Sequence, residues 1–467
     1  MHRHRVATTW VVLAVLVLFL PPLLTRTPFF SVFDFSLWGK DWLKLSGCIR
    51  RGELPCDTAG ISKFPLGYLL NSYYVVVMGA RGFNPGRAIG LLNTLFLALP
   101  IAFIVLIRGL RASLPRSLVY ILAILLTTVP PFYIFGALEV QSGVVIGIFI
   151  SSLVLMNEDL RRPGETALAV LLFITALLLP LYKDTNTLVL FVGLAVAGTQ
   201  AWLGKANHST EPESAIHRWR TAWSLITALS VGLAISATYN FVKGGSVLPL
   251  AYLNEASQTS PRPAKMLEFF VGTYFSPNGG VAVFWGGALY ATVWLLRRFE
   301  LVISRTGAFV ASAVVLAYSV VLSYWWAPFG WDAWGDRLML PAMLATVICL
   351  TATARERSPT PNDRPRRRDG RESDAPLRRV ARVVRDGAIV LIVLLSLHYT
   401  VLSYYANRDA VMMASMFGGP KCRQMGRDLG PGEATLGLAF WRSDSYYACA
   451  RERFIHVPVY IGGRPRR

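Results

Sequence analysis

Charged residues are scarce in this chain, and acidic residues are the scarcest. Asp, Glu, Lys and Arg together make up 16% of the 467 residues, against 54% hydrophobic residues and a mean hydropathy of +0.45. A soluble protein of this length needs more polar surface than this composition supplies. Apolar runs of about 17–22 residues recur along the sequence, so we expect an all-α, polytopic helical membrane protein.

The motifs of nucleotide and zinc chemistry are also missing. The sequence contains no G-x-x-x-x-G-K-[ST] loop, no dinucleotide fingerprint and no paired His/Cys spacing. The net charge of +20 does not indicate nucleic acid as a partner, because no basic patch falls in a segment that would fold as a soluble domain. The basic residues instead predict loops that fix the orientation of the chain in a membrane.

About eleven apolar runs are long enough to be spans. The first run follows MHRHR and is predicted to be a retained helix rather than a signal peptide, because no small-residue cleavage site follows it. The predicted spans lie at 8–24, 87–107, 118–135, 139–156, 166–182, 186–203, 221–241, 280–296, 307–325, 337–353 and 387–405.

Arginine and lysine gather in alternate loops, which predicts a plasma-membrane protein with its N-terminus in the cytoplasm. Segment 354–386 holds eleven arginines against six acids and is predicted to be a disordered cytoplasmic loop. The same alternation predicts an outer face made of loop 25–86, loop 242–279, the turn 325–341 and a C-terminal tail, 406–467. The membrane domain is accordingly predicted to cover 1–405.

Cysteine is rare, with five in the chain. Cys48 and Cys56 lie in the first outer loop, Cys422 and Cys449 lie in the tail, and Cys349 lies inside a predicted span. An oxidising exterior would then hold up to two disulfides, with the pairing left open. Four free thiols are the alternative.

Two acids in the first outer loop are candidates for a catalytic base. Asp34 and Asp41 lie among Phe and Trp in FSVFDFSLWGKDW, and their spacing of two helical turns would align them on one face of a short helix. A partly desolvated carboxylate is a usable general base. The alternative is that each is a solvated loop acid or a helix cap.

The remaining candidate residues come from distant parts of the sequence, yet all are predicted at the outer face. Lys63 is either a phosphate ligand or a snorkelling anchor, and Lys183 either binds a ligand or pairs with Asp184. At one membrane face, the acids would supply a general base, and Lys and Arg would hold a phosphate group. The candidates are Lys63, Glu139, Lys183, Lys243, Trp331, Asp332 and Arg337.

The order of these motifs resembles that of the bacterial polytopic glycosyltransferases of the GT-C superfamily, relatives of protein O-mannosyltransferases and aminoarabinose transferases. The resemblance runs over about 8–405. Gly335, Arg337 and Pro341 align with the family's W-x-G-G-x-x-x-G-x-R-x-x-x-P, although Phe329-Gly330 and Asp336 depart from it. Further similar segments are Asp34 with Gly52-Glu53-Leu54-Pro55, Lys63-Phe64-Pro65-Leu66, Glu139, Lys183, Tyr239 to Ser246 and Phe275 to Gly280.

The resemblance implies an inverting transfer of a sugar from a polyprenyl-phosphate donor to a hydroxyl of a lipid, glycan or protein. Asp34, or Asp41 in its place, would be the base, and Arg337 with Lys183 or Lys63 would hold the departing phosphate. Asp332 would instead neutralise Arg337 in the resting state if it does not bind substrate. Glu139 with an aspartate would be able to hold a divalent metal. The residues expected to bind substrate are Glu139, Lys243, Trp331 and Asp332.

Two rival functions have the same membrane plan. A transporter or lipid flippase would place its polar residues at mid-membrane in two related halves, and the sequence shows neither feature. A non-catalytic protein of envelope assembly would not need the ordered motifs.

Overall fold

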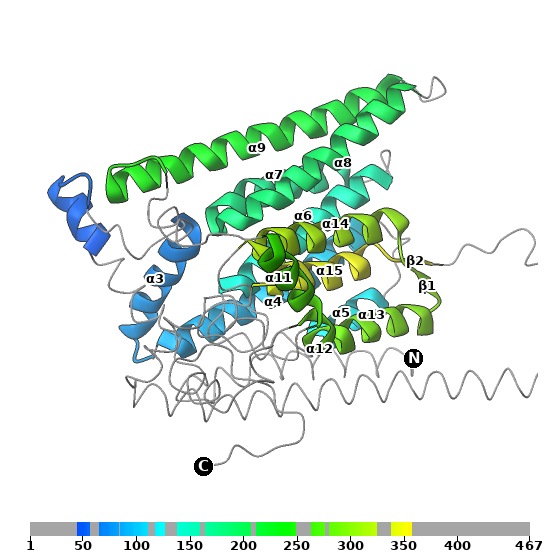
Figure 1. The fold of residues 1–467 in the computed structure, drawn as a ribbon, viewed down its shortest axis with the longest axis horizontal. Helices are drawn as coiled ribbons and strands as arrows, with labels where there is room; N and C mark the ends of the chain where they lie inside the picture. Colours follow the sequence, from blue (N-terminus) through cyan, green and yellow to red (C-terminus); the bar gives the residue numbers. More distant parts are fainter. Residues whose placement is uncertain are drawn as a thin grey trace, which may run out of the picture.

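The computed structural model describes residues 44–56, 65–83, 85–110, 117–126, 138–158, 164–206, 212–248, 263–275, 280–324 and 338–356. Nearly all of this part is helical, in agreement with the predicted all-α class (Figure 1). The long helices are α4 (Pro85–Leu110), α6 (Leu138–Glu158), α7 (Glu165–Tyr182), α8 (Thr187–Ala206), α9 (Pro212–Gly244) and α14 (Arg305–Ser323).

Shorter elements complete the described part. Residues 44–51 form a helix in the first predicted outer loop. Strands β1 (Leu301–Val302) and β2 (Arg355–Glu356) form one antiparallel pair. The other short elements are α3 (Pro65–Gly79), α5 (Ser117–Leu126), the 3₁₀ turn η2 (Asp184–Asn186), α11 (Pro263–Phe275), α12 (Val281–Phe284), α13 (Gly286–Arg298) and α15 (Leu340–Ala352).

Five described helices are long and apolar enough to cross a membrane, namely those containing Ala88–Ile107, Glu139–Asn157, Glu165–Tyr182, Trp219–Gly244 and Arg305–Ser323. Nine of the predicted spans coincide at least partly with described helices. One prediction, 280–296, differs in detail, because the helix is interrupted at Trp285 between α12 and α13. Spans 8–24 and 387–405 and the tail 406–467 lie outside the described residues, so the count of eleven and the orientation stay predictions.

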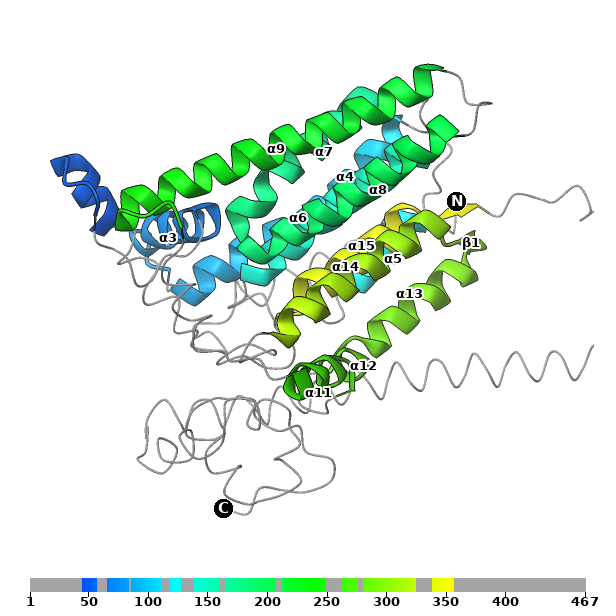
Figure 2. The same cartoon turned by 45° about the horizontal axis from the view of Figure 1, so that its top comes forward.

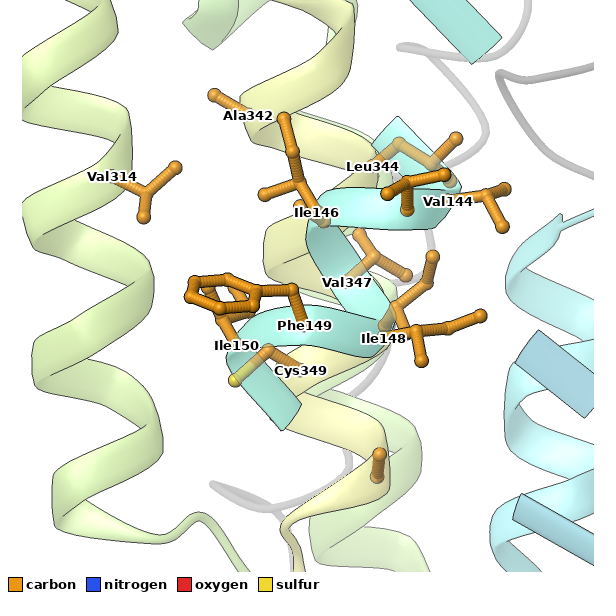
Figure 3. Packing of buried hydrophobic residues seen from close by; sticks show 14 of the residues in the cluster. Val144, Ile146, Ile148, Phe149, Ile150, Val314, Ala342, Leu344, Val347 and Cys349 are labelled. Atoms are coloured by element: carbon orange, nitrogen blue, oxygen red, sulfur yellow. The ribbon is translucent and has the colours of Figure 1, made fainter. Parts of the chain in front are cut away.

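Helix α6 lies at the centre of the bundle. Its apolar segment is 94% buried, against 28% for that of α9, which runs along one edge (Figures 1 and 2). In Figure 3, Phe149 of α6 points towards α14, whereas Val144 and Ile148 point to the opposite side. A helix that is covered on every side is typical of the core of a large membrane bundle.

Two glycines let α15 approach α6 closely. A Cβ added at Gly147 would lie 2.7–3.0 Å from three atoms of Ile348, and one at Gly143 would lie 3.2 Å from the Cα of Pro341. Gly143 and Gly147 form a G-x-x-x-G pattern, which brings helix backbones together in membranes. The contact fixes the beginning of α15 against the second turn of α6.

The bundle has two chemically different ends (Figure 2). At the Glu139 end, α6 and α15 begin and α7 and α9 end. At the opposite end, β1 follows α13 and β2 follows α15, with Leu301 opposite Glu356 and Val302 opposite Arg355. We call this strand pair the clasp and this end of the bundle the clasp end. The clasp joins the beginning of α14 to the end of α15.

The close contact predicts a stability effect at Gly147. We expect Gly147→Ala to lower the free energy of unfolding by about 1–3 kcal/mol, because the new methyl group overlaps Ile348. Gly198→Ala in α8 is the matched control, since nothing lies within 4 Å of its added Cβ. Reversible unfolding in detergent micelles measures both. Equal effects of the two substitutions would contradict the account of the α6–α15 contact.

Candidate functional site

The first two turns of α6 carry three polar side chains that bond to neighbouring elements. Glu139, Gln141 and Ser142 are all buried, and each bonds to a different neighbouring element. Glu139 and Ser142 are three residues apart and share one face of the helix, whereas Gln141 points to another side, so one short segment reaches neighbours on two sides. We call the resulting set the polar layer; its members are Asn71, Asn93, Glu139, Gln141, Ser142, Lys183, Asn186 and Tyr318.

A buried ion pair joins α6 to the end of α7. The Nζ of Lys183 donates to Oε1 of Glu139 over 2.9 Å, and the two side chains are only 9% and 6% exposed. Glu139 lies in the first turn of α6, and Lys183 is the C-cap residue of α7. Each charge therefore also interacts favourably with the dipole of its own helix.

An amide network ties α3 and α4 to the same turn of α6. Gln141 Nε2 donates to Oδ1 of Asn71 and of Asn93, over 2.8 and 2.9 Å. Asn71 Nδ2 returns a bond of 3.1 Å to Gln141 Oε1 and donates to the carbonyl of Gly67. All three side chains are buried and bonded, so the network rigidifies these helix ends rather than weakening them.

The turn between α7 and α8 is held in a similar way. Asn186 in η2 donates to Oγ of Ser142 over 3.3 Å and accepts from the hydroxyl of Tyr318 on α14 over 2.6 Å. The next residue of α14, Ser319, donates to the hydroxyl of Tyr274 on α11 over 2.9 Å. The polar layer thus connects five helices and η2 at one end of the bundle.

Lys243 lies apart from this layer, near the end of α9. Its Nζ is 5.7 Å from the ring centroid of Tyr239, which makes a cation–π contact, and the residue is 4% exposed. Gly232 of α9 packs against Pro180 of α7, and Lys243 is about 16 Å further along the helix axis. Lys243 therefore faces the first predicted outer loop rather than the α6 turn.

That loop is fastened to α9. A disulfide joins Cys48 to Cys56, and the backbone N–H of Cys56 donates to the carbonyl of Val242 over 2.8 Å. Leu45, both cysteines and Tyr239 form a small apolar cluster of their own. Gly245 has a φ of +72°, which favours glycine, and it lies against Pro55.

An exposed ion pair lies in the same loop. Arg51 bonds Glu53 over 2.8 Å, and this hydrogen bond holds the pKa of the Glu53 carboxyl below its usual range. Both side chains are about 60% exposed, so the pair contributes little to stability.

The structure brings together two of the predicted site residues, Glu139 and Lys183. The ion-pair partner that it shows for Lys183 is Glu139, 44 residues away in the sequence. It also fixes one disulfide, Cys48 with Cys56, whereas Cys349 is a buried cysteine outside that disulfide. The candidates outside the described residues are Asp34, Asp41, Lys63, Trp331, Asp332 and Arg337, together with Cys422 and Cys449.

Sequence reasoning missed the amide network and the pair of Asn186 and Tyr318. A signal was present, because Asn71, Asn93 and Gln141 are polar residues inside apolar segments, and such residues are costly in a membrane without a partner. The G-x-x-x-G pattern of α6 was a second signal.

No group of three or more His, Cys, Asp or Glu that could hold a metal occurs among the residues the structure describes. Glu139, the described residue considered as a metal ligand, accepts a hydrogen bond from the ammonium of Lys183. Comparisons with protein-family models, curated proteins and solved structures found no match to this chain.

The ion pair predicts strong coupling between its two members. Glu139→Gln or Lys183→Met alone should lower the free energy of unfolding by about 3–5 kcal/mol, because each leaves an unpaired buried charge. The double variant should lose much less stability than the sum of the losses in the two single variants. A double-mutant cycle in detergent measures the coupling, and additive losses would show that the two charges do not depend on each other.

The fastened loop predicts a pattern of thiol reactivity. Non-reducing peptide mass spectrometry should recover the segments of Cys48 and Cys56 linked to each other. Cys349 should react with a thiol reagent only after unfolding, since it is buried in the core. Labelling of Cys48 in the native, unreduced protein would contradict the fastened loop.

Proposed function

We propose that this protein is a membrane glycosyltransferase of the GT-C type. It moves a hexosyl or pentosyl group from a polyprenyl-phosphate donor to a hydroxyl of an envelope lipid, glycan or protein, with inversion. The reaction takes place at the Glu139 end of the bundle, on the extracytoplasmic side of the plasma membrane. The observation that carries the proposal is the buried Lys183 ammonium held by Glu139 at that end.

A buried lysine at this depth has a chemical use. The ammonium has three N–H donors, of which Glu139 accepts one. In an apolar setting the remaining donors interact strongly with an anion, and a lipid phosphate is the anion that a membrane delivers there. Glu139 keeps the ammonium charged and oriented until such a phosphate arrives.

The neighbouring elements support the same location. Pro341 of α15 packs on Gly143, one helical turn after Glu139. Arg337 precedes Leu338, the first described residue before α15, in the sequence. We assign Arg337 to the phosphate together with Lys183 and Lys63, and Trp331 and Asp332 to the sugar or the lipid. Lys243, beside the fastened loop, is assigned to the acceptor side.

The chemistry follows from these roles. The carboxylate of Asp34 takes the proton of the acceptor hydroxyl, and the acceptor oxygen forms a bond to the anomeric carbon. The bond from that carbon to the phosphate oxygen breaks on the opposite face, and the phosphate leaves with the electron pair. Its charge grows from that of a diester towards that of a monoester, so Arg337 and Lys183 stabilise the transition state more than the ground state.

The direct test uses the purified protein in lipid with a polyprenyl-phosphate sugar. Wild-type protein should release free polyprenyl phosphate, and Asp34→Asn should reduce turnover by at least about a hundredfold, because general-base catalysis is lost. Asp41→Asn is the matched control in the same loop. Full activity of Asp34→Asn with loss in Asp41→Asn would move the base to Asp41.

The same assay separates the rival function. A flippase would transfer the intact lipid across the bilayer and release no free polyprenyl phosphate. Transport without cleavage would therefore contradict the proposed reaction.

A further inference from the structure

The clasp end carries exposed arginines that the proposed reaction does not use. Arg297 and Arg298 end α13, Arg305 begins α14, and Arg355 lies on β2; all four are exposed. Because β1 pairs with β2, Arg355 lies next to the segment that connects Arg298 to Arg305. Two exposed acids, Glu300 and Glu356, share this end, so arginines outnumber acids there two to one.

Arg305 is unfavourable for its own helix. It is the first residue of α14, directly after the N-cap Ser304, whose oxygen accepts from the N–H of Gly307 over 2.9 Å. The positive end of the helix dipole favours acids at this position and disfavours a cation. Arg305 therefore gains no stabilisation from the dipole of its own helix.

An apolar stripe continues from Arg305 along α14. Phe309, Leu316 and Val320 are 66%, 51% and 45% exposed, and with the exposed Ser312 they follow the i, i+4, i+7 spacing of one helix face. From Arg305 to Leu316 the helix axis covers roughly 16 Å. The hydrocarbon depth of one leaflet is similar, about half of roughly 30 Å.

Aromatic residues mark the depth of a membrane surface at the same end. Trp294 lies one turn before Arg298 on α13, and Phe299 is 44% exposed. On α9, Trp219 and Trp223 are 51% and 62% exposed beside the exposed Arg220. Tryptophan next to arginine is typical of the headgroup region.

We propose that the clasp end binds an anionic phospholipid of the leaflet it faces. The phosphate of the headgroup lies against Arg298 and Arg305, with Arg297 beside them, and an acyl chain lies along Phe309 and Leu316. Each arginine near an anionic headgroup contributes a similar increment to the binding free energy. Bound lipid then stabilises the junction of α13, α14 and β2. This site is independent of the proposed transferase reaction.

The test is made on the full chain in detergent micelles. Titration with short-chain phosphatidylglycerol, followed by native mass spectrometry and thermal unfolding, gives an apparent Kd. Arg298→Gln with Arg305→Gln should raise this Kd by about 25-fold, roughly fivefold for each arginine. Arg298→Lys with Arg305→Lys retains the charge and should remain within a few-fold of wild type.

Two further variants make the outcome decisive. Arg50→Gln with Arg81→Gln removes two exposed arginines near the Glu139 end and should leave the Kd unchanged. Phe309→Ser should weaken the lipid but not the binding of a water-soluble glycerophosphate. Unchanged affinity in the Arg298 and Arg305 double glutamine variant, equal affinity for phosphatidylcholine, or equal stabilisation by inorganic phosphate would each overturn the proposal.

Discussion

The rest of the structure depends on the need to pair a charge inside an apolar bundle. Lys183 and Glu139 are both more than nine-tenths buried, and neither charge is stable there without the other. Their pairing holds the end of α7 to the beginning of α6. The amide network and Asn186 then attach α3, α4 and α14 to the same turn. One end of the bundle is thereby rigid and polar, as group transfer from a lipid phosphate requires.

The two ends of the bundle differ in the way their charges meet the surroundings. At the Glu139 end, lysines are buried and held by an acid or an aromatic ring. At the clasp end, arginines are exposed and lie beside exposed aromatic and aliphatic residues. Buried charge can serve chemistry, because its strength is not screened by water, whereas exposed arginine suits the headgroups of a lipid surface.

Much of the helical plan follows from the sequence, since long apolar runs have few alternatives to a helix in lipid. Counting alternate spans also predicted that Glu139 and Lys183 share one side, and their contact is consistent with this. That Lys183 pairs with Glu139 was not predictable, because this contact depends on how α7 packs against α6. The break at Trp285 directly precedes Gly286-Gly287, and a glycine pair is a signal of a helix interruption that the span prediction did not use. Asp34, Asp41 and Arg337 lie outside the described residues, so their roles stay predictions.

The central claim is that the Glu139 end binds the phosphate of a polyprenyl lipid. A structure of the protein in a lipid nanodisc with bound polyprenyl phosphate tests it most directly. The account predicts phosphate density in contact with the Nζ of Lys183 and its disappearance in Lys183→Met. Phosphate at the clasp end alone, or density at the Glu139 end that persists in Lys183→Met, would contradict the account.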